Sequence, residues 1–166
     1  MPEKRTLERA ARDKRQGKSA STQAGEFVRE EMDHIREGKH GARSTKQAIA
    51  IGLSKARRAG VGLKPPKSGS SRTRKQAARD YARGHGAPRR AKASAKRSRA
   101  SEGALKREGR SAASPRALAR QAHSAASRRS ASSRSASARR AVRTKGAAAR
   151  SAAARKAART RSARAH

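Results

Sequence analysis

Positive charge is the feature that most constrains this chain. Its 166 residues include 46 Lys and Arg against 11 Asp and Glu, a formal net charge of +35, with one Phe, one Tyr and no Trp. A chain with so much charge and so few large apolar side chains can bury little surface against the entropy of ordering its backbone. We therefore expect most of it to be disordered when free, and to need a polyanionic partner such as DNA, RNA or an anionic lipid surface.

The charge is unevenly divided along the chain. Residues 1–66 hold 16 basic and 8 acidic side chains, a net charge of +8, whereas residues 67–166 hold 30 and 3, a net charge of +27. The change falls at Lys64–Arg72, whose paired prolines and Gly/Ser cluster are typical of a linker. We accordingly divide the chain into three parts. They are a weak N-terminal helix and linker at 1–20, a helical module at 21–63 and a low-complexity basic tail at 64–166.

The first helix predicted in the module covers Ala24–Glu37. Ser21 or Thr22 can cap its start, and Gly38 can end it in the left-handed conformation. At 100° per residue its apolar side chains share one face. They are Ala24, Phe27, Val28, Met32 and Ile35. The acidic side chains Glu26, Glu30, Asp33 and Glu37 share the opposite face, which we interpret as solvated or as a weak electrostatic dock for basic segments.

The second helix predicted in the module covers Thr45–Ala59. Ser44 and Gln47 form a capping box at its start, and Gly60 supplies its end. Its apolar and small side chains also share a face, so the two helices should pack as a hairpin. These side chains are Ala48, Ile49, Gly52, Leu53, Ala56 and Ala59. The predicted fold class is mainly α: a small helical hairpin, with a third short helix at Leu7–Gln16, followed by a long disordered basic tail.

Ile51 lies on the far side of the second helix, about 160° from Ile49 and away from the hairpin seam. A hairpin of about 40 residues is at the size where oligomerisation or another staple is usually needed for stability. We therefore expect Ile51 to support self-association and to give a homodimer through the hairpin.

The tail repeats Ala, Arg, Lys and Ser from Lys67 onward. Ala and Arg favour helix, but Arg side chains four residues apart, such as Arg155 and Arg159, repel one another until phosphate neutralises them. We expect the tail to be disordered or transiently helical when free, and partly helical on a polyanion.

Catalytic, metal and cofactor sites are not predicted. The five histidines have no spacing that builds a closed metal site, and Glu30 with His34, four residues apart, is interpreted as a solvated pair. No nucleophile or phosphate-binding loop accompanies the acidic face, so we expect no enzymatic activity. There is no Cys to form a disulfide, no apolar signal-peptide core and no run of residues long enough to span a bilayer. We expect a cytoplasmic protein that does not enter membranes.

The segment STQAGEFVREEMDHIREGKHGARSTKQAIAIGLSKARRAGVGLKPP, within Ser19–Pro66, resembles a family of short bacterial proteins that share a domain of unknown function and are often labelled DNA-binding or histone-like. The tail is similar to the Ala/Lys/Arg-rich ends of bacterial histone H1-like proteins. The resemblance implies a bacterial, cytoplasmic, nucleoid-associated protein, and it carries no catalytic residues over to this chain.

The function predicted from the sequence is non-enzymatic, largely sequence-independent binding of duplex DNA through phosphate neutralisation. The predicted contacts around the second helix are Lys39, Arg43, Lys46, Lys55, Arg57 and Arg58. Those in the tail are Arg139, Arg140, Arg143, Lys145, Arg150, Arg155, Lys156 and Arg159. Two alternatives stay open. One is an RNA-binding or ribosome-associated protein, and the other is a protein-interaction module whose basic tail adds avidity.

Overall fold

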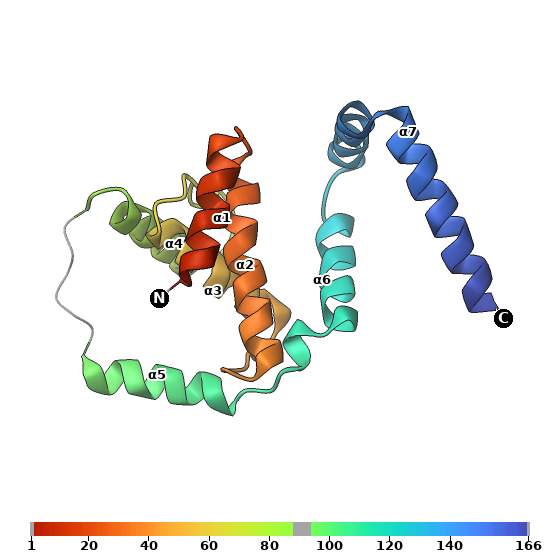
Figure 1. Ribbon diagram of the computed structural model, residues 1–166. Coiled ribbons are helices and arrows are strands. Elements are labelled where there is room, and N and C mark those ends of the chain that lie inside the picture. Colours follow the sequence, from red (N-terminus) through yellow and green to blue (C-terminus); the bar gives the residue numbers. More distant parts are fainter. Residues whose placement is uncertain (1, 88–93, 166) are drawn as a thin grey trace. The chain divides into compact units, whose positions relative to one another are not determined.

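The computed structural model describes residues 2–87 and 94–165, and for 144, 145, 164 and 165 it describes the backbone alone. Within these ranges the chain folds into seven α-helices and one short 3₁₀ helix (Figure 1). They are α1 (Lys4–Arg15), α2 (Ala20–Glu37), α3 (Thr45–Arg58), α4 (Ser71–Gly84), α5 (Ala95–Arg107), η1 (Ser111–Ala113), α6 (Pro115–Ser127) and α7 (Ala131–Ala165). The chain forms two compact units, residues 1–121 and 122–166, which are described separately.

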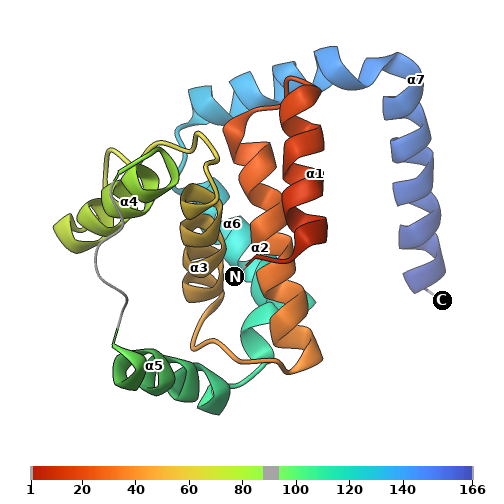
Figure 2. The same cartoon turned by 60° about the vertical axis from the view of Figure 1, so that its left-hand side comes forward.

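The two helices predicted for the module are present as α2 and α3. Ser19 caps α2 in place of Ser21 or Thr22, and Gly38 ends the helix with φ 79° as predicted. Ser44 accepts the Gln47 amide at the start of α3, and Gly60 follows its end with φ 86°. The chain therefore forms the expected antiparallel pair (Figure 2).

The seam between α2 and α3 is built on close approach. Phe27 and Ile35 of α2 are fully buried, as is Ala48 of α3. A Cβ added to Gly52 would lie 2.7 Å from the Cα of Val28, so only glycine fits at this crossing. Small residues on α3 thus let the two backbones come together, as the sequence pattern indicated.

The predicted N-terminal helix is present as α1, which packs on α2 (Figure 1). Its buried face is Thr6, Ala10 and Asp13, whereas Leu7, its largest apolar side chain, is 41% exposed. Asp13 is held by Lys18, whose Nζ lies 2.7 Å from Oδ1. The helix is therefore fixed by a polar contact as well as by Ala10, which lies in one core cluster with Ala24 and Phe27.

The predicted fold class, a small hairpin followed by a long disordered tail, is wrong. The described parts of 64–166 are mostly helical, and α4 and η1 pack on the hairpin. Ala112 and Ala113 are buried in one core cluster with Met32, Ile35 and other side chains, and Leu118 packs against it. Buried alanines make most of this contact, so a shortage of large apolar side chains does not prevent the segment from packing.

Hydrogen bonds to backbone carbonyls also hold the same segment against the hairpin. The Gly41 amide donates to the Leu105 carbonyl at 2.8 Å, and the Thr45 hydroxyl donates to the Ala112 carbonyl at 2.7 Å. A Cβ on Gly41 would overlap the carbonyl of Glu108, so the loop after α2 needs glycine here. The chain from 105 to 113 therefore docks against the turn between α2 and α3.

Helix α4 covers the face of α3 that carries Ile51. Ser54, one turn after Ile51, donates a hydrogen bond to buried Asp80 of α4, and Arg58 lies 3.8 Å from the same carboxylate. Ile51 itself is half-buried. A segment expected to be disordered thus packs on the helix that carries Ile51, and self-association through Ile51 stays a prediction.

The second unit consists of the last residues of α6 together with the whole of α7. Gly146 interrupts α7 with φ 64° and ψ 171°, so the helix has two segments. No side chain described between 122 and 163 is buried. In the part of the chain that the structure describes, no helix has both the length and the apolar character of a membrane span.

Candidate nucleic-acid interface

Acidic side chains are nearly all engaged by bases of the same chain. Among the residues that the structure describes, ten of the eleven acidic side chains lie within 4.0 Å of a Lys, Arg or His side chain. Several of these acids are also withdrawn from solvent, including Asp13, Glu31 and Asp80. The described surface therefore offers little unpaired negative charge to oppose its exposed basic side chains.

The acidic face of α2 is solvated only in part: the side chains of Asp33 and Glu37 are 46% and 56% exposed, whereas Glu30 is buried. Glu30 is 5% exposed and Glu31, which sequence reasoning did not single out, is 1% exposed. Lys55 of α3 lies between them, with Nζ 3.3 Å from Glu30 Oε1 and 2.6 Å from Glu31 Oε2. Glu31 Oε2 makes no hydrogen bond, so this ion pair is what compensates its burial. The predicted electrostatic dock is occupied by basic side chains of the same chain: Lys55 of α3 pairs with Glu30, and Arg9 of α1 pairs with Glu26.

Three predicted contacts on α3 are thus committed to the fold. Lys55 is held by the two glutamates, and its side chain is 16% exposed. Arg57 is buried and donates from Nε to the Leu63 carbonyl at 3.2 Å. Burial lowers the pKa of Arg57, and the charge of Asp80 partly offsets that effect. Arg58 is more exposed, but it pairs with Asp80 and donates to the Ser54 carbonyl.

Lys39 occupies an intermediate position in the loop after α2. Its side chain is 51% exposed, and its Nζ lies 3.0 Å from Glu37 and 3.1 Å from Glu3. Both hydrogen bonds raise the pKa of Lys39, and the bond to Glu37 has the larger effect. A phosphate would have to compete with two carboxylates for this ammonium group.

Arg43 and Lys46 are the predicted contacts near α3 that stay open to a partner. Both are exposed, and they flank the Ser44 cap at the start of the helix. The amide of Arg43 is used by the Gln47 side chain, while its guanidinium reaches solvent. Of the six residues predicted around the second helix, these two best fit contact with phosphate.

The predicted tail contacts lie on α7, where they are exposed. They are Arg139, Arg140, Arg143, Arg150, Arg155, Lys156 and Arg159. Arg150 donates a hydrogen bond from Nε to the Gly146 carbonyl. The side chain of Lys145 lies outside the described residues.

Basic side chains surround α7 rather than lining one face. Relative to Arg150, the positions of Arg155, Arg159 and Lys156 fall at about 140°, 180° and 240° around the helix axis. A helix that is polar on every side has no apolar face to pack on a protein core. It can instead present cations to phosphates in whichever direction they approach.

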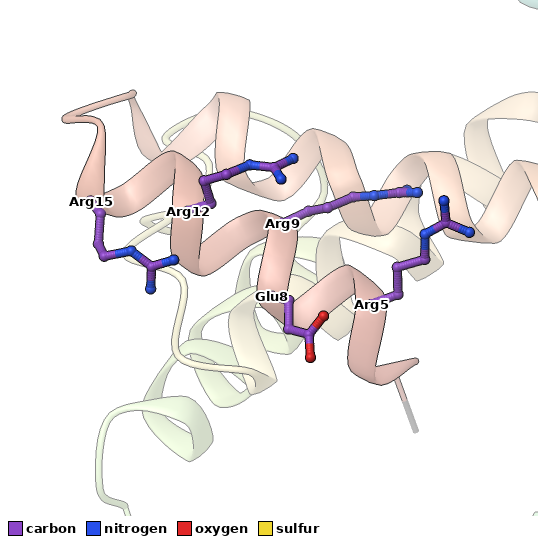
Figure 3. Close-up of a pocket in the computed structure, with 5 residues that line it drawn as sticks. All are labelled: Arg5, Glu8, Arg9, Arg12 and Arg15. Carbon is purple, nitrogen blue, oxygen red and sulfur yellow. The ribbon is translucent and has the colours of Figure 1, made fainter.

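A further basic row, on α1, was not among the predicted contacts. Arg5, Arg9, Arg12 and Arg15 project from this helix together with Glu8 and line a shallow hollow (Figure 3). Arg9 is committed to Glu26 at 3.7 Å, while the other three arginines are exposed. The i, i+4, i+7 spacing of Arg5, Arg9 and Arg12 is the sequence signal that could have identified the row.

No family model, curated protein or solved structure matches this chain. These comparisons lend no support to DNA binding or to any other function, and the likeness to histone-like proteins stays an expectation.

Proposed function

We propose that this protein is a non-enzymatic, largely sequence-independent DNA-binding protein that acts by neutralising phosphates. The observation that carries the proposal is helix α7, which has eleven Lys and Arg and no acidic residue over 35 residues. Its described basic side chains are exposed, and the chain keeps its acids paired elsewhere. A surface of this kind attracts a polyanion, and the bacterial nucleoid is where we propose that it acts.

Counterion release supplies the binding free energy. Each phosphate that a Lys or Arg neutralises frees condensed cations from the duplex, so the logarithm of the association constant falls linearly with the logarithm of the salt concentration. If α7 and its neighbours engage about ten phosphates, the slope on duplex DNA is about −9. Arginine adds paired hydrogen bonds to phosphate oxygens, and it outnumbers lysine in α7.

Sequence preference should be weak. Reading base edges requires side chains that a rigid scaffold places in the major groove. The basic residues of α7 point to all sides, and no described side chain of its unit is buried against a core. We therefore expect random and selected duplexes to differ by less than about tenfold in affinity, since phosphate contacts carry no sequence information.

The test compares two triple variants of the full chain that have the same net charge. One replaces Arg150, Arg155 and Arg159 of α7 by Gln, and the other replaces Arg5, Arg12 and Arg15 of α1 by Gln. The α7 variant should lose duplex affinity more strongly and flatten the salt slope by about 3. Equal losses would mean that bulk charge decides, and that α7 is not the binding surface.

A salt-matched competition between duplex DNA and structured RNA identifies the partner. Our proposal expects duplex DNA to compete at least as well as RNA of equal length. Clear preference for RNA, together with RNA crosslinks in cells, would replace DNA by RNA as the partner of the same basic surface.

A further inference from the structure

Three side chains of the kind that bind metal ions converge beside the end of α2. One carboxylate oxygen of Glu31 and one ring nitrogen each of His34 and His40 lie within 4.8 Å of one another. Glu31 and His34 are nearly one turn apart on α2. His40 returns over them because Gly38, with φ 79°, reverses the chain. Glu31 and His34 have the Glu-x-x-His spacing found in some helical metal sites, but His40 is brought to them only by the turn after α2.

We propose that Glu31, His34 and His40 bind one divalent transition-metal ion, with Zn²⁺ as the best match. Two imidazole nitrogens and one carboxylate oxygen are a ligand set that Zn²⁺ accepts, with bonds of about 2.0–2.2 Å. Imidazole distinguishes the site from those of Mg²⁺ and Ca²⁺, which prefer oxygen ligands throughout. The proposal is independent of DNA binding, because none of the three side chains belongs to the basic surfaces.

The distances suit a small tetrahedral ion. Bonds of about 2.0–2.1 Å place two ligand atoms about 3.3 Å apart across a tetrahedron. His40 Nε2 and Glu31 Oε1 already lie 3.2 Å apart. The other ligand atoms need to approach by no more than about 1.5 Å, which side-chain rotation can supply. The side chains of His34 and His40 are 12% and 16% exposed, so an ion and a water molecule could enter from solvent.

Both imidazoles also have the outer contacts that metal-bound histidines use. Nδ1 of His40 lies 3.1 Å from the Gly41 carbonyl, which can accept its proton and leave the Nε2 lone pair directed toward Glu31. Nε2 of His34 lies 2.8 Å from a carboxylate oxygen of Glu3. Such contacts fix the orientation and tautomer of a ligating histidine.

The local charge favours a divalent cation. Direct contacts around the two imidazoles join four carboxylates to two ammonium groups. These groups are Glu3, Glu30, Glu31, Glu37, Lys39 and Lys55. When both imidazoles are neutral, the charges of these six groups sum to −2. Two of the carboxylates, those of Glu30 and Glu31, are buried. One divalent ion balances that charge, while Lys55 keeps its place on Glu31 Oε2 and leaves Oε1 for the metal.

A bound ion would join three parts of the chain. Glu31 and His34 belong to α2, His40 belongs to the loop on which residues 105–109 dock, and Glu3 precedes α1. The role that this placement supports is that of a staple, which adds stability to a unit with few large apolar side chains.

Calorimetric titration of the full chain with Zn²⁺ at pH 7.5 tests the site. We expect one ion per chain with a dissociation constant at or below the micromolar range, and a higher melting temperature in its presence. His40→Gln should weaken binding by at least about 100-fold, while His123→Gln, an exposed control on α6, should leave it unchanged. Absence of saturable binding, or equal binding by both variants, would overturn the proposal.

A second measurement needs no substitution and guards against a variant that fails to fold. Imidazole ¹⁵N chemical shifts of the parent protein report which ring nitrogens coordinate an added ion. Large shifts at His34 and His40, with His85 and His123 unmoved, would support the site. Shifts confined to the other histidines would refute it.

Discussion

Lys55 gives the sharpest test of how the structure uses positive charge. The sequence places it among DNA contacts, whereas the structure makes it the counterion of two buried glutamates. Lys55→Gln removes that counterion and leaves Glu30 and Glu31, whose side chains are 2% and 1% exposed, without its compensation. The matched control is Lys46→Gln, which removes one exposed charge from the same helix.

The expected cost follows from the burial of the three side chains. Removing one partner of a buried ion pair costs about 3–5 kcal/mol. The lower end, about 3 kcal/mol, applies here because Lys55 retains some access to water and His40 still lies 3.2 Å from Glu31. The control should change the free energy of unfolding by less than about 0.5 kcal/mol.

Urea unfolding followed by circular dichroism, with a chelator present, measures both variants. A loss of about 3 kcal/mol lowers the urea midpoint by roughly 1–2 M for a protein of this size. Replacing both glutamates by Gln in the Lys55→Gln background should restore much of the loss, because no unpaired buried charge remains. If Lys55→Gln unfolds at the same urea concentration as Lys46→Gln, the burial of this cluster is refuted.

Three further predictions concern packing and pH. Gly52→Ala should destabilise the protein by roughly 1–3 kcal/mol in thermal unfolding, because the new methyl group meets the Val28 backbone. The better helix propensity of Ala offsets only part of this loss. An unchanged melting temperature would contradict the close crossing of α2 and α3. Thr45→Val should cost about 1–3 kcal/mol by leaving the buried Ala112 carbonyl unpaired, and faster amide exchange at 105–113 would locate the damage. Hydrogen bonds from His34 and then Lys39 lower the pKa of Glu3 to about 2. The contribution of Glu3 to stability is therefore present above about pH 4.5 and is lost as the pH falls toward 2. The difference in melting temperature between the parent and Glu3→Gln should vanish over that range. A difference that persists at pH 2 would exclude the contacts of Glu3 with His34 and Lys39 as its source.

The helical module could be predicted because its signals are local. Apolar spacing in Ala24–Glu37 and Thr45–Ala59, the Ser44 cap and the Gly38 and Gly60 ends each depend on residues within a turn or two of one another. The small side chain of Gly52 indicated close approach of the two helices, and the structure confirms it. Sequence reasoning failed where the contact partner is distant, as for Ala112 and Ala113, whose partners lie some seventy residues earlier.

The sequence by itself determined the excess of positive charge, the run of basic residues without acids after Glu108, the start of α3 and the glycines that end α2 and α3. Only the tertiary structure decided which cations stay on the surface. Lys46 and Lys55 are both lysines on α3, and nothing in their local sequence tells that one faces solvent while the other neutralises Glu30 and Glu31. The physical reason is that composition fixes total charge, whereas the pairing and burial of each charge depend on which helices pack across it.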